Sequence, residues 1–253
     1  MHWIYLSPHF DDAALSCGGI IWEAVRRGAQ VSIWTVCAAP PPKGRLSPFA
    51  EQLHARWGTG PEATEQRRQE DIASCALLGA AYRHLDLHDC IYRTGPNGEF
   101  LYTSEESLND GLQRLDQVWI EALFKELQRD IPANARLVCP LTFGNHVDHQ
   151  LTRVAAERLG KRLWYYADYP YVARRPAQLA ELAENGWRAR RFRVSKPGLA
   201  AWQASVAAHA SQISTFWPSV PAMQEAIQSY AALEHATSLW QKGENRATAG
   251  NLA

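Results

Sequence analysis

Closely spaced cysteines are missing from this sequence. The chain has five cysteines without a C-x-x-C pair among them: Cys17, Cys37, Cys75, Cys90 and Cys139. Their wide separation argues against a thiolate zinc site and against a disulfide framework. We expect most of them to be small core residues of a reduced, cytoplasmic protein.

An excess of one charge is also missing, since 26 Lys and Arg side chains balance 26 Asp and Glu side chains. No global field therefore draws the protein to nucleic acid or to anionic lipid. One basic run does occur, RARRFR at residues 188–193, and its alternation predicts a strand with one charged face. The sequence lacks an apolar run of the about 18 residues that a membrane helix needs, and it lacks a basic N-terminal segment followed by an apolar one. We therefore expect neither membrane insertion nor secretion.

Hydrophobic residues make up 46% of the chain and follow two alternating patterns. Short apolar runs predict buried strands at residues 3–6, 31–36, 83–87, 136–140 and 163–167. Helical patterns separate them at residues 13–27, 62–78, 107–129 and 148–159, and residues 39–61 and 89–104 are expected to be long loops. Alternating strands and helices predict βαβ units, hence an α/β fold that is a Rossmann-like three-layer sandwich with a mostly parallel sheet.

The pattern becomes less regular after residue 171. We expect a strand near residues 187–194 and helices at about 199–213 and 221–241. No linker or internal repeat is present, so we predict one domain over residues 1–253. Its core covers about residues 1–170, and a C-terminal helical elaboration covers about residues 171–245.

Two of the predicted loops carry the side chains that metals prefer, at strand ends where open parallel sheets bind ligands. They hold His9, Asp11 and Asp12 after the first strand, and His146, Asp148 and His149 after the fourth. An aspartate at a helix start is usually an N-cap, which alone would explain Asp12 and Asp148. Two such clusters at strand ends of one sheet are much less easily explained by capping.

The spacing of the first cluster favours a metal site. His9 and Asp12 are three residues apart across a strand-to-helix turn, so both side chains can face one point while Asp11 is directed elsewhere. A histidine from the second cluster would complete a set of two histidines and one carboxylate. That set suits catalytic zinc with an open position for water, whose pKa zinc lowers to about 7. Asp11 is then the candidate for the base that takes the proton of this water.

Three segments form an ordered series along the chain: PHFDDAALSCGGII, RRQEDIASCALLGA and GNHVDHQLTRVAAERLG. Together they resemble the successive motifs of the PIG-L or LmbE-like family of zinc-dependent deacetylases, which carries a P-H-P-D-D-E type motif at the first strand end and an H-x-D-H motif near the middle. HASQI at residues 209–213 also resembles a family element. The resemblance covers about the first 170 residues and reinforces the predicted fold.

The resemblance also implies a role for eight side chains. It makes His9, Asp12 and His149 the zinc ligands, Asp11 the general base, His146 the group that stabilises the oxyanion or protonates the departing amine, Asp148 the group that orients His146, and Arg67 and Asp89 substrate-binding residues. Arg67 belongs to an R-x-x-E pattern with Glu70. The implied cofactor is Zn²⁺, and another divalent metal such as Fe²⁺ would use the same ligands.

The sequence departs from the family pattern at three positions. Phe10 replaces the usual proline and Ala13 the usual glutamate of the first motif. Gly144 stands two residues before His146, where some members have a catalytic tyrosine. None of these changes removes an implied ligand or base, but they leave open what shapes the pocket and what else stabilises the oxyanion.

The activity implied by the resemblance is hydrolysis of an N-acetyl or other N-acyl amide on an amino sugar, with an N-acetylglucosamine-containing glycoside as substrate. The expected partner is therefore a small molecule, and a homo-oligomer is left open. Two alternatives remain: an amidase that cleaves a thiol conjugate or other amide with the same machinery, and a catalytically silent sugar-binding relative. A third reading takes His146 and Asp148 for part of a non-haem iron triad. The alternation of strands and helices disfavours it, because such ligands normally lie on antiparallel barrel strands.

Overall fold

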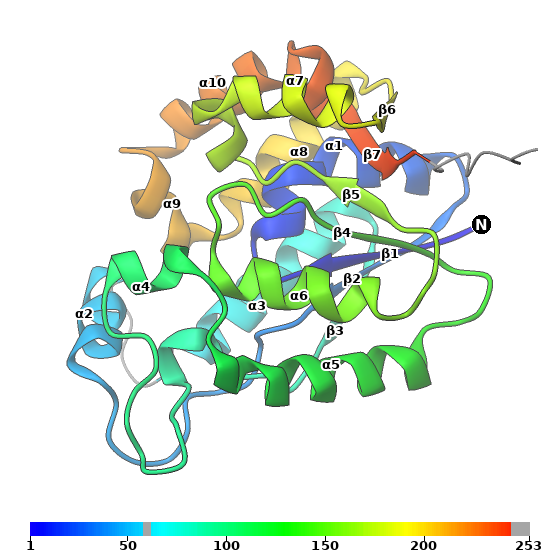
Figure 1. Ribbon diagram of the computed structural model, residues 1–253. Coiled ribbons are helices and arrows are strands. Elements are labelled where there is room, and N and C mark those ends of the chain that lie inside the picture. Colours follow the sequence, from blue (N-terminus) through cyan, green and yellow to red (C-terminus); the bar gives the residue numbers. More distant parts are fainter. Residues whose placement is uncertain (58–61, 244–253) are drawn as a thin grey trace, which may run out of the picture.

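The computed structural model describes residues 1–57 and 62–243. In this part of the chain one seven-stranded sheet has the order β3-β2-β1-β4-β5-β7-β6 (Figure 1). The strands are β1 His2–Ser7, β2 Gln30–Thr35, β3 Ala81–His84, β4 Arg136–Pro140, β5 Trp164–Tyr166, β6 Trp187–Arg191 and β7 Ser238–Lys242. Strands β1 to β5 pair in parallel, whereas β7 is antiparallel to both β5 and β6. The predicted mostly parallel α/β sheet is confirmed.

Helices cover both faces of this sheet. The longer ones are α1 Asp12–Arg26, α3 Ala63–Leu78, α5 Gln117–Asp130, α6 Val147–Glu157, α8 Lys196–Ala207 and α10 Val220–Ala231. Helices α1, α3 and α8 pack against one another on one side, and α5 packs against α6 on the other (Figure 1). The three-layer arrangement is therefore also confirmed.

Strand β1 lies inside the sheet, between β2 and β4, and is buried on both faces. Ile4 and Leu6 belong to one hydrophobic cluster, and Trp3 and Tyr5, which point the other way, belong to a second. Successive side chains of a strand alternate between faces, so an uninterrupted apolar run is what a strand covered on both sides requires. This position inside the sheet fixes the carboxyl end of β1, where the first cluster of polar residues begins.

Four shorter helices, α2 Pro48–Arg56, α4 Glu105–Asp110, α7 Pro176–Glu184 and α9 Ala210–Phe216, lie outside these layers. All four depart from the sequence predictions: α7 was not expected, and α9 begins inside the single helix expected at residues 199–213. The expected loop at residues 39–61 contains α2, which begins after Ser47, whose hydroxyl accepts the N–H of Ala50 at 3.0 Å. The expected helix at residues 107–129 is divided into α4 and α5, because the chain is extended at Gly111.

The C-terminal segment also differs from its prediction. The expected helix at residues 221–241 ends at Ala231 as α10, and the chain then forms β7, which inserts between β5 and β6. The elaboration is therefore not purely helical, since it adds two strands to the sheet. Strands β6 and β7 belong to the same sheet as β1 to β5. Residues 58–61 of the predicted loop and residues 244–245 of the predicted elaboration lie outside the described residues.

The basic run at residues 188–193 forms β6 and the turn that follows it, as predicted. The prediction of a single charged face is wrong. Arg188 and Arg190 lie on one face of the strand, Arg191 lies on the other, and Arg193 follows in the turn. No described helix is long and apolar enough to cross a membrane. All five cysteines are free and buried, which confirms their expected place in the interior.

Candidate metal centre

The turn after β1 brings His9 and Asp12 together. The hydroxyl of Ser7 accepts the N–H of Ala13 at 3.0 Å and so ties the end of β1 to the start of α1. Within this turn the backbone N–H of His9 donates to Oδ2 of Asp12 at 2.7 Å. The same oxygen lies 3.2 Å from Nδ1 of His9. Asp12 therefore does not act as an ordinary helix cap; its carboxylate closes the turn and meets the histidine ring.

The turn after β4 delivers the second cluster. Its backbone is left-handed at Thr142, Gly144 and Asn145, with φ angles of 70°, 89° and 63°. Such angles are costly for residues other than glycine and persist where the surroundings enforce them. The amide of Asn145 provides part of that support by donating to the carbonyl of Asn109 at 2.8 Å. Helix α6 then begins after His146, whose Nδ1 accepts the N–H of Asp148 at 3.2 Å.

Three imidazole rings meet between these two turns. The ring centroids of His9 and His146 are 4.8 Å apart, and His149 lies 5.6 Å from His9 and 5.5 Å from His146. One nitrogen of each ring lies within 4.8 Å of the others. The carboxylate of Asp12 joins this group, because its Oδ2 is 3.3 Å from Nε2 of His149. The structure thus brings together the three predicted ligands and the predicted acid, His146.

Two buried carboxylates hold the outer edges of the histidines. Nε2 of His9 lies 3.1 Å from Oδ2 of Asp148, and Nδ1 of His149 lies 2.6 Å from Oδ1 of Asp168. A carboxylate accepts a hydrogen bond from the nitrogen it faces, so we assign N–H groups to these outer nitrogens. With a metal bound, the inner nitrogens would offer their lone pairs on the Asp12 side. This is how carboxylates orient histidines that bind metals.

The carboxylate of Asp148 contacts His9 and not His146, the residue it was expected to orient. It accepts the N–H of Cys90 at 3.0 Å and the guanidinium of Arg93 at 2.5 Å. Only the backbone N–H of Asp148 reaches His146. A side chain with no exposed surface and three partners is fixed in place, so Asp148 fixes the ring of His9 in turn.

Carboxylates dominate the electrostatics of the cluster. Burial alone would lower the pKa of His149, but the charge and hydrogen bond of Asp12 outweigh it, and Asp168 adds to them, which raises this pKa to about 10. The pKa of His9 is likewise raised, because its hydrogen bonds to Asp12 and Asp148 overcome burial. Burial and the neighbouring charge of His9 lower the pKa of His146 to about 3. The site therefore favours a positive charge between Asp12 and its two histidines, with a neutral imidazole at its edge.

Two thiols lie near enough to form other groupings, Cys37 with His9 and Asp148, and Cys90 with His146 and Asp148. Burial and the charge of Asp148 raise the pKa of both thiols well above the ordinary value. A thiol binds a metal as the thiolate, so these groupings are less suited to a cation than the imidazole and carboxylate set.

The remaining predicted site residues lie beside this cluster. Asp11 has its Oδ1 3.5 Å from a guanidinium nitrogen of Arg67, and both side chains are buried. That guanidinium lies between two rings, 5.3 Å from the centroid of Phe10 and 5.1 Å from that of Trp57. Asp89 caps the short helix η1 Cys90–Tyr92 and has its Oδ2 3.6 Å from Nε2 of His9. All eight predicted side chains therefore gather at one edge of the sheet.

Glu70, the other residue of the R-x-x-E pattern, has a different place. Its carboxylate accepts the N–H and the hydroxyl of Ser211 at 3.0 and 2.6 Å. This contact anchors α9 to α3 and carries the segment that includes Gln212 and Phe216 to the site.

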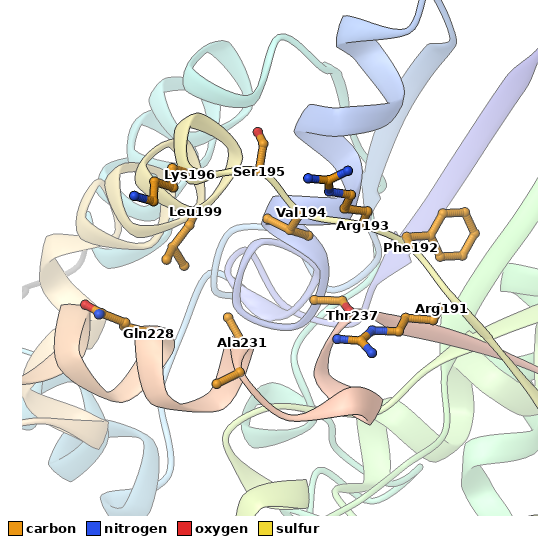
Figure 2. Close-up of a pocket in the computed structure, with 11 residues that line it drawn as sticks. Arg191, Phe192, Arg193, Val194, Ser195, Lys196, Leu199, Gln228, Ala231 and Thr237 are labelled. Carbon is orange, nitrogen blue, oxygen red and sulfur yellow. The ribbon is translucent and has the colours of Figure 1, made fainter.

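A cavity of about 190 Å³, here called the site cavity, opens over the cluster. Its polar end is formed by His9, Asp11, Asp12, Arg67, Asp89 and His146, and its aromatic walls by Trp57, Tyr171 and Phe216. A second cavity of about 510 Å³ lies between β6, α8 and α10 (Figure 2). It is larger, but histidine, aspartate, glutamate and cysteine are absent from the described residues that line it. The site cavity is therefore where metal and hydrolytic chemistry can occur.

Three contributors were not predicted from the sequence. Asp168 holds His149, Arg93 holds Asp148, and Tyr171 lines the site cavity. Asp168 and Tyr171 follow the end of β5, so the rule that located the other clusters at strand ends would have found them. The side chain of Arg93 is fully buried between Asp148 and Asp116.

The donor set fits a divalent metal ion. Zinc bonds of about 2.0–2.1 Å in a tetrahedral site put neighbouring ligand atoms about 3.3 Å apart. The distances from Oδ2 of Asp12 to His9 and His149 are 3.2 and 3.3 Å. Two imidazoles and one carboxylate beside a cavity are also the kind of donor set found in catalytic metal sites.

Comparison with known proteins places these features among deacetylases. The 2'-N-acetylparomamine deacetylase of Streptomyces fradiae is 31% identical over 179 residues, which cover 69% of this chain and 59% of that protein. The chain thus matches less than two thirds of the length of that relative. The 2'-N-acetylparomamine deacetylase of Niallia circulans is 29% identical over 210 residues, which cover 76% of this chain and 74% of the relative.

A solved structure shares the whole described architecture. The zinc-inhibited form of teicoplanin deacetylase Orf2 superposes with a TM-score of 0.77 at 26% identity, over 95% of this chain and 97% of that one. The family model described as PIG-L, GlcNAc-PI de-N-acetylase, matches residues 4–159. Because this match covers more than half of the 253 residues, the chain belongs to the PIG-L family.

Proposed function

We propose that the protein is a zinc-dependent hydrolase that removes an N-acetyl group from an amino sugar, with an N-acetylglucosamine-containing glycoside as its substrate class. The observation that carries this proposal is the position of Asp12, whose Oδ2 lies 3.2 Å from His9 and 3.3 Å from His149 at the base of a cavity that Asp11 also lines. The names of the relatives support the same reaction and a glycoside substrate.

His9, Asp12 and His149 would hold the metal. Zinc, when bound, supplies a Lewis acid that acidifies water and polarises an acyl carbonyl. Asp148 and Asp168 keep the two histidines in the tautomer and orientation that this binding needs. Fe²⁺ or another divalent ion would use the same three side chains.

Asp11 serves as the general base in this proposal. It lines the site cavity but is directed to Arg67 and not into the ligand set. The carboxylate takes the proton of the attacking water as oxygen bonds to the acyl carbon. The guanidinium of Arg67, 3.5 Å from Oδ1, holds the side chain of Asp11 at the edge of the site cavity.

His146 completes the chemistry from the other side. Its Nδ1 accepts the N–H of Asp148, so its Nε2 is the nitrogen that addresses the substrate. The Nε2–H of the ring donates a hydrogen bond to the oxyanion, and the proton that Asp11 took from water passes to the amine nitrogen as the C–N bond breaks, releasing acetate and a free amine. Asp89 and Arg67 are then placed to bind sugar hydroxyls at the polar end of the site cavity.

The test combines metal analysis with a substrate panel. Purified protein is analysed for metal and incubated with N-acetylated glycosides and with amide-linked thiol conjugates, and free amine is measured. We expect zinc binding and release of amine from N-acetylglucosaminides. A metal-free protein that is inert on the whole panel would refute the proposal, and faster cleavage of thiol conjugates would assign it to the amidases.

We also propose a reduced, cytoplasmic location for this reaction. It is supported by five cysteines that are all free and buried.

A further inference from the structure

The second cavity, of about 510 Å³, shares no lining residue with the site cavity and has no part in the proposed reaction. It lies behind the turn from β6 to α8, with α8 on one side and α10 on another (Figure 2). Its volume falls within the range of about 300–1,000 Å³ that is usual for small-molecule sites. We call it the basic cavity, because Arg191, Arg193 and Lys196 line it together with Val194, Leu199 and Ala231.

Positive charge is concentrated around the basic cavity although the chain as a whole is neutral. Of the described residues that line it, none is acidic. No described carboxylate lies within 4.0 Å of Arg193 or Lys196, whereas Arg27 on the neighbouring helix pairs with Glu23 at 3.2 Å. Two such cations beside a concave region whose described lining holds no carboxylate create a positive potential there, which attracts anions.

The basic cavity also has apolar walls. Val194 and Leu199 contribute branched aliphatic side chains, and Ala231 of α10 lies across from them (Figure 2). Figure 2 also shows Lys196 on the α8 side and Arg191 on the β6 side, so the charges border the apolar region from two directions. A ligand that fits both features has an anionic group and an apolar body.

The turn that forms the basic cavity is held firmly by its neighbours. The N–H of Ser195 donates to Glu23 at 2.7 Å, and the hydroxyl of Ser195 caps α8 by accepting the N–H of Gly198 at 3.2 Å. The N–H of Phe192 donates to the carbonyl of Thr237 at 2.7 Å. A cavity whose walls are already fixed loses little conformational entropy when a ligand enters, which favours binding.

We propose that the basic cavity is a binding site for a small anionic amphiphile, a carboxylate or phosphate on an alkyl or aryl body. Arg193 and Lys196 bind the anionic group, and Val194, Leu199 and Ala231 contact the apolar body. Guanidinium and ammonium groups both suit phosphate and carboxylate oxygens. This site is separate from the catalytic one, so its test does not depend on the proposed reaction.

The test is a calorimetric titration of the full chain with octyl phosphate below its micelle concentration. Octanol, inorganic phosphate and octylamine serve as probes that lack one feature or reverse the charge. We expect saturable binding of octyl phosphate, and binding at least about tenfold weaker for each of the three other probes. Equal binding of octanol would show that the charges do not matter and would overturn the proposal, as would no saturable binding of octyl phosphate.

Variants then assign the binding to this cavity. The double variant Arg193→Gln/Lys196→Gln removes two exposed charges, so its fold and its thermal midpoint should be kept. We expect it to bind octyl phosphate at least about tenfold more weakly, while Arg188→Gln, which removes a charge outside the cavity, binds like the wild type. Equal weakening by both variants would indicate nonspecific attraction and refute the site. If the double variant Arg193→Gln/Lys196→Gln lost more affinity for phosphatidylglycerol vesicles than for octyl phosphate, the surface would be assigned to membranes instead.

Discussion

The ring of Tyr171 occupies the space into which a side chain at Gly144 would extend. A Cβ atom built on Gly144 would lie 2.8 Å from two ring carbons of Tyr171, closer than real Cβ atoms approach. The same ring lies edge-on to His149, with 6.3 Å between centroids. The turn that carries His146 and the wall of the site cavity are therefore fitted to each other through a glycine.

Replacing Gly144 by alanine should disturb both partners. The new methyl group meets the ring of Tyr171, and the backbone φ of +89° is unfavourable for alanine. We expect a loss of about 1–3 kcal/mol in the free energy of unfolding, and a fall in kcat because His146 moves. Gly98→Ala is the matched control, since its φ of +80° is similar but nothing lies within 4 Å of the added atom. If both variants lost the same free energy of unfolding in urea, the backbone conformation alone would account for the loss.

Asp11→Asn should separate metal binding from turnover. The amide keeps the shape of the side chain but cannot accept a proton, so we expect zinc content like the wild type and a fall in kcat of about 10²- to 10⁴-fold. His149→Ala removes a predicted ligand and should lose the metal itself. Zinc content and amine release are measured on the same preparations, with Glu225→Gln at an exposed position as control. Wild-type kcat in pure Asp11→Asn would remove Asp11 as the base.

Asp168→Asn tests how the histidine is held. The carboxylate lies 2.6 Å from Nδ1 of His149 and accepts the N–H of Phe143 at 2.9 Å through its other oxygen. Loss of such a partner typically weakens metal binding by about 10- to 100-fold. Competition with a chelator measures this affinity, and Glu121→Gln at the surface should leave it unchanged. An unaltered metal affinity in Asp168→Asn would show that Asp168 serves packing alone.

The strand-end polar clusters were predictable because each needs only a few neighbouring residues. His9 and Asp12 lie within one turn, and the sheet rule places that turn opposite His149. Arg93 was harder, because its partner Asp148 is 55 residues away in sequence and only the folded chain shows which carboxylate it meets. The role of residues that depart from the family pattern, such as Phe10, can likewise be assigned only from the side chains that pack on them.

The errors in secondary structure have similar causes. Ser47 followed by Pro48 is a helix-start signal that was available in the sequence, but the prolines before it favoured a loop. Strand β7 could not be separated from α10 by periodicity, because its conformation depends on pairing with β5 and β6. Tertiary pairing of this kind overrides local propensity.

Stability at acid pH should depend on Glu23. Burial would raise its pKa, but hydrogen bonds from Ser195 and the charge of Arg27 outweigh burial and lower the pKa below its ordinary value. A lowered pKa in the folded state means that the contribution is complete above the unfolded pKa of about 4.3 and is lost as the pH falls through the folded pKa.

Glu23→Gln should therefore destabilise the protein by about 1–2 kcal/mol at pH 7, and the difference from the wild type should shrink below about pH 4. Urea unfolding with chelator present at several pH values measures this without interference from the metal. Glu121→Gln, at an exposed ion pair, should cost less than about 0.5 kcal/mol at every pH. A gap that stays constant with pH would mean that the charge of Glu23 is not what matters.

Arg67→Lys should show whether the contact between Arg67 and the ring of Phe10 contributes to activity. The guanidinium carbon of Arg67 lies 5.3 Å from the ring centroid of Phe10 and 5.1 Å from that of Trp57, and one of its nitrogens lies 3.5 Å from Asp11. Lysine would keep the charge but not the planar group. Each ring contact is worth about 0.5–1 kcal/mol, so losing both should lower kcat/KM by about 5- to 30-fold, whereas Phe10→Leu, which loses one, should lower it by about 2- to 5-fold. Arg68→Lys is the control on the same helix, because Arg68 donates to the carbonyl of Ala38 outside the site cavity. If Arg67→Lys were as active as the wild type, stacking would have no part in positioning Asp11, and Phe10 would be a packing residue only.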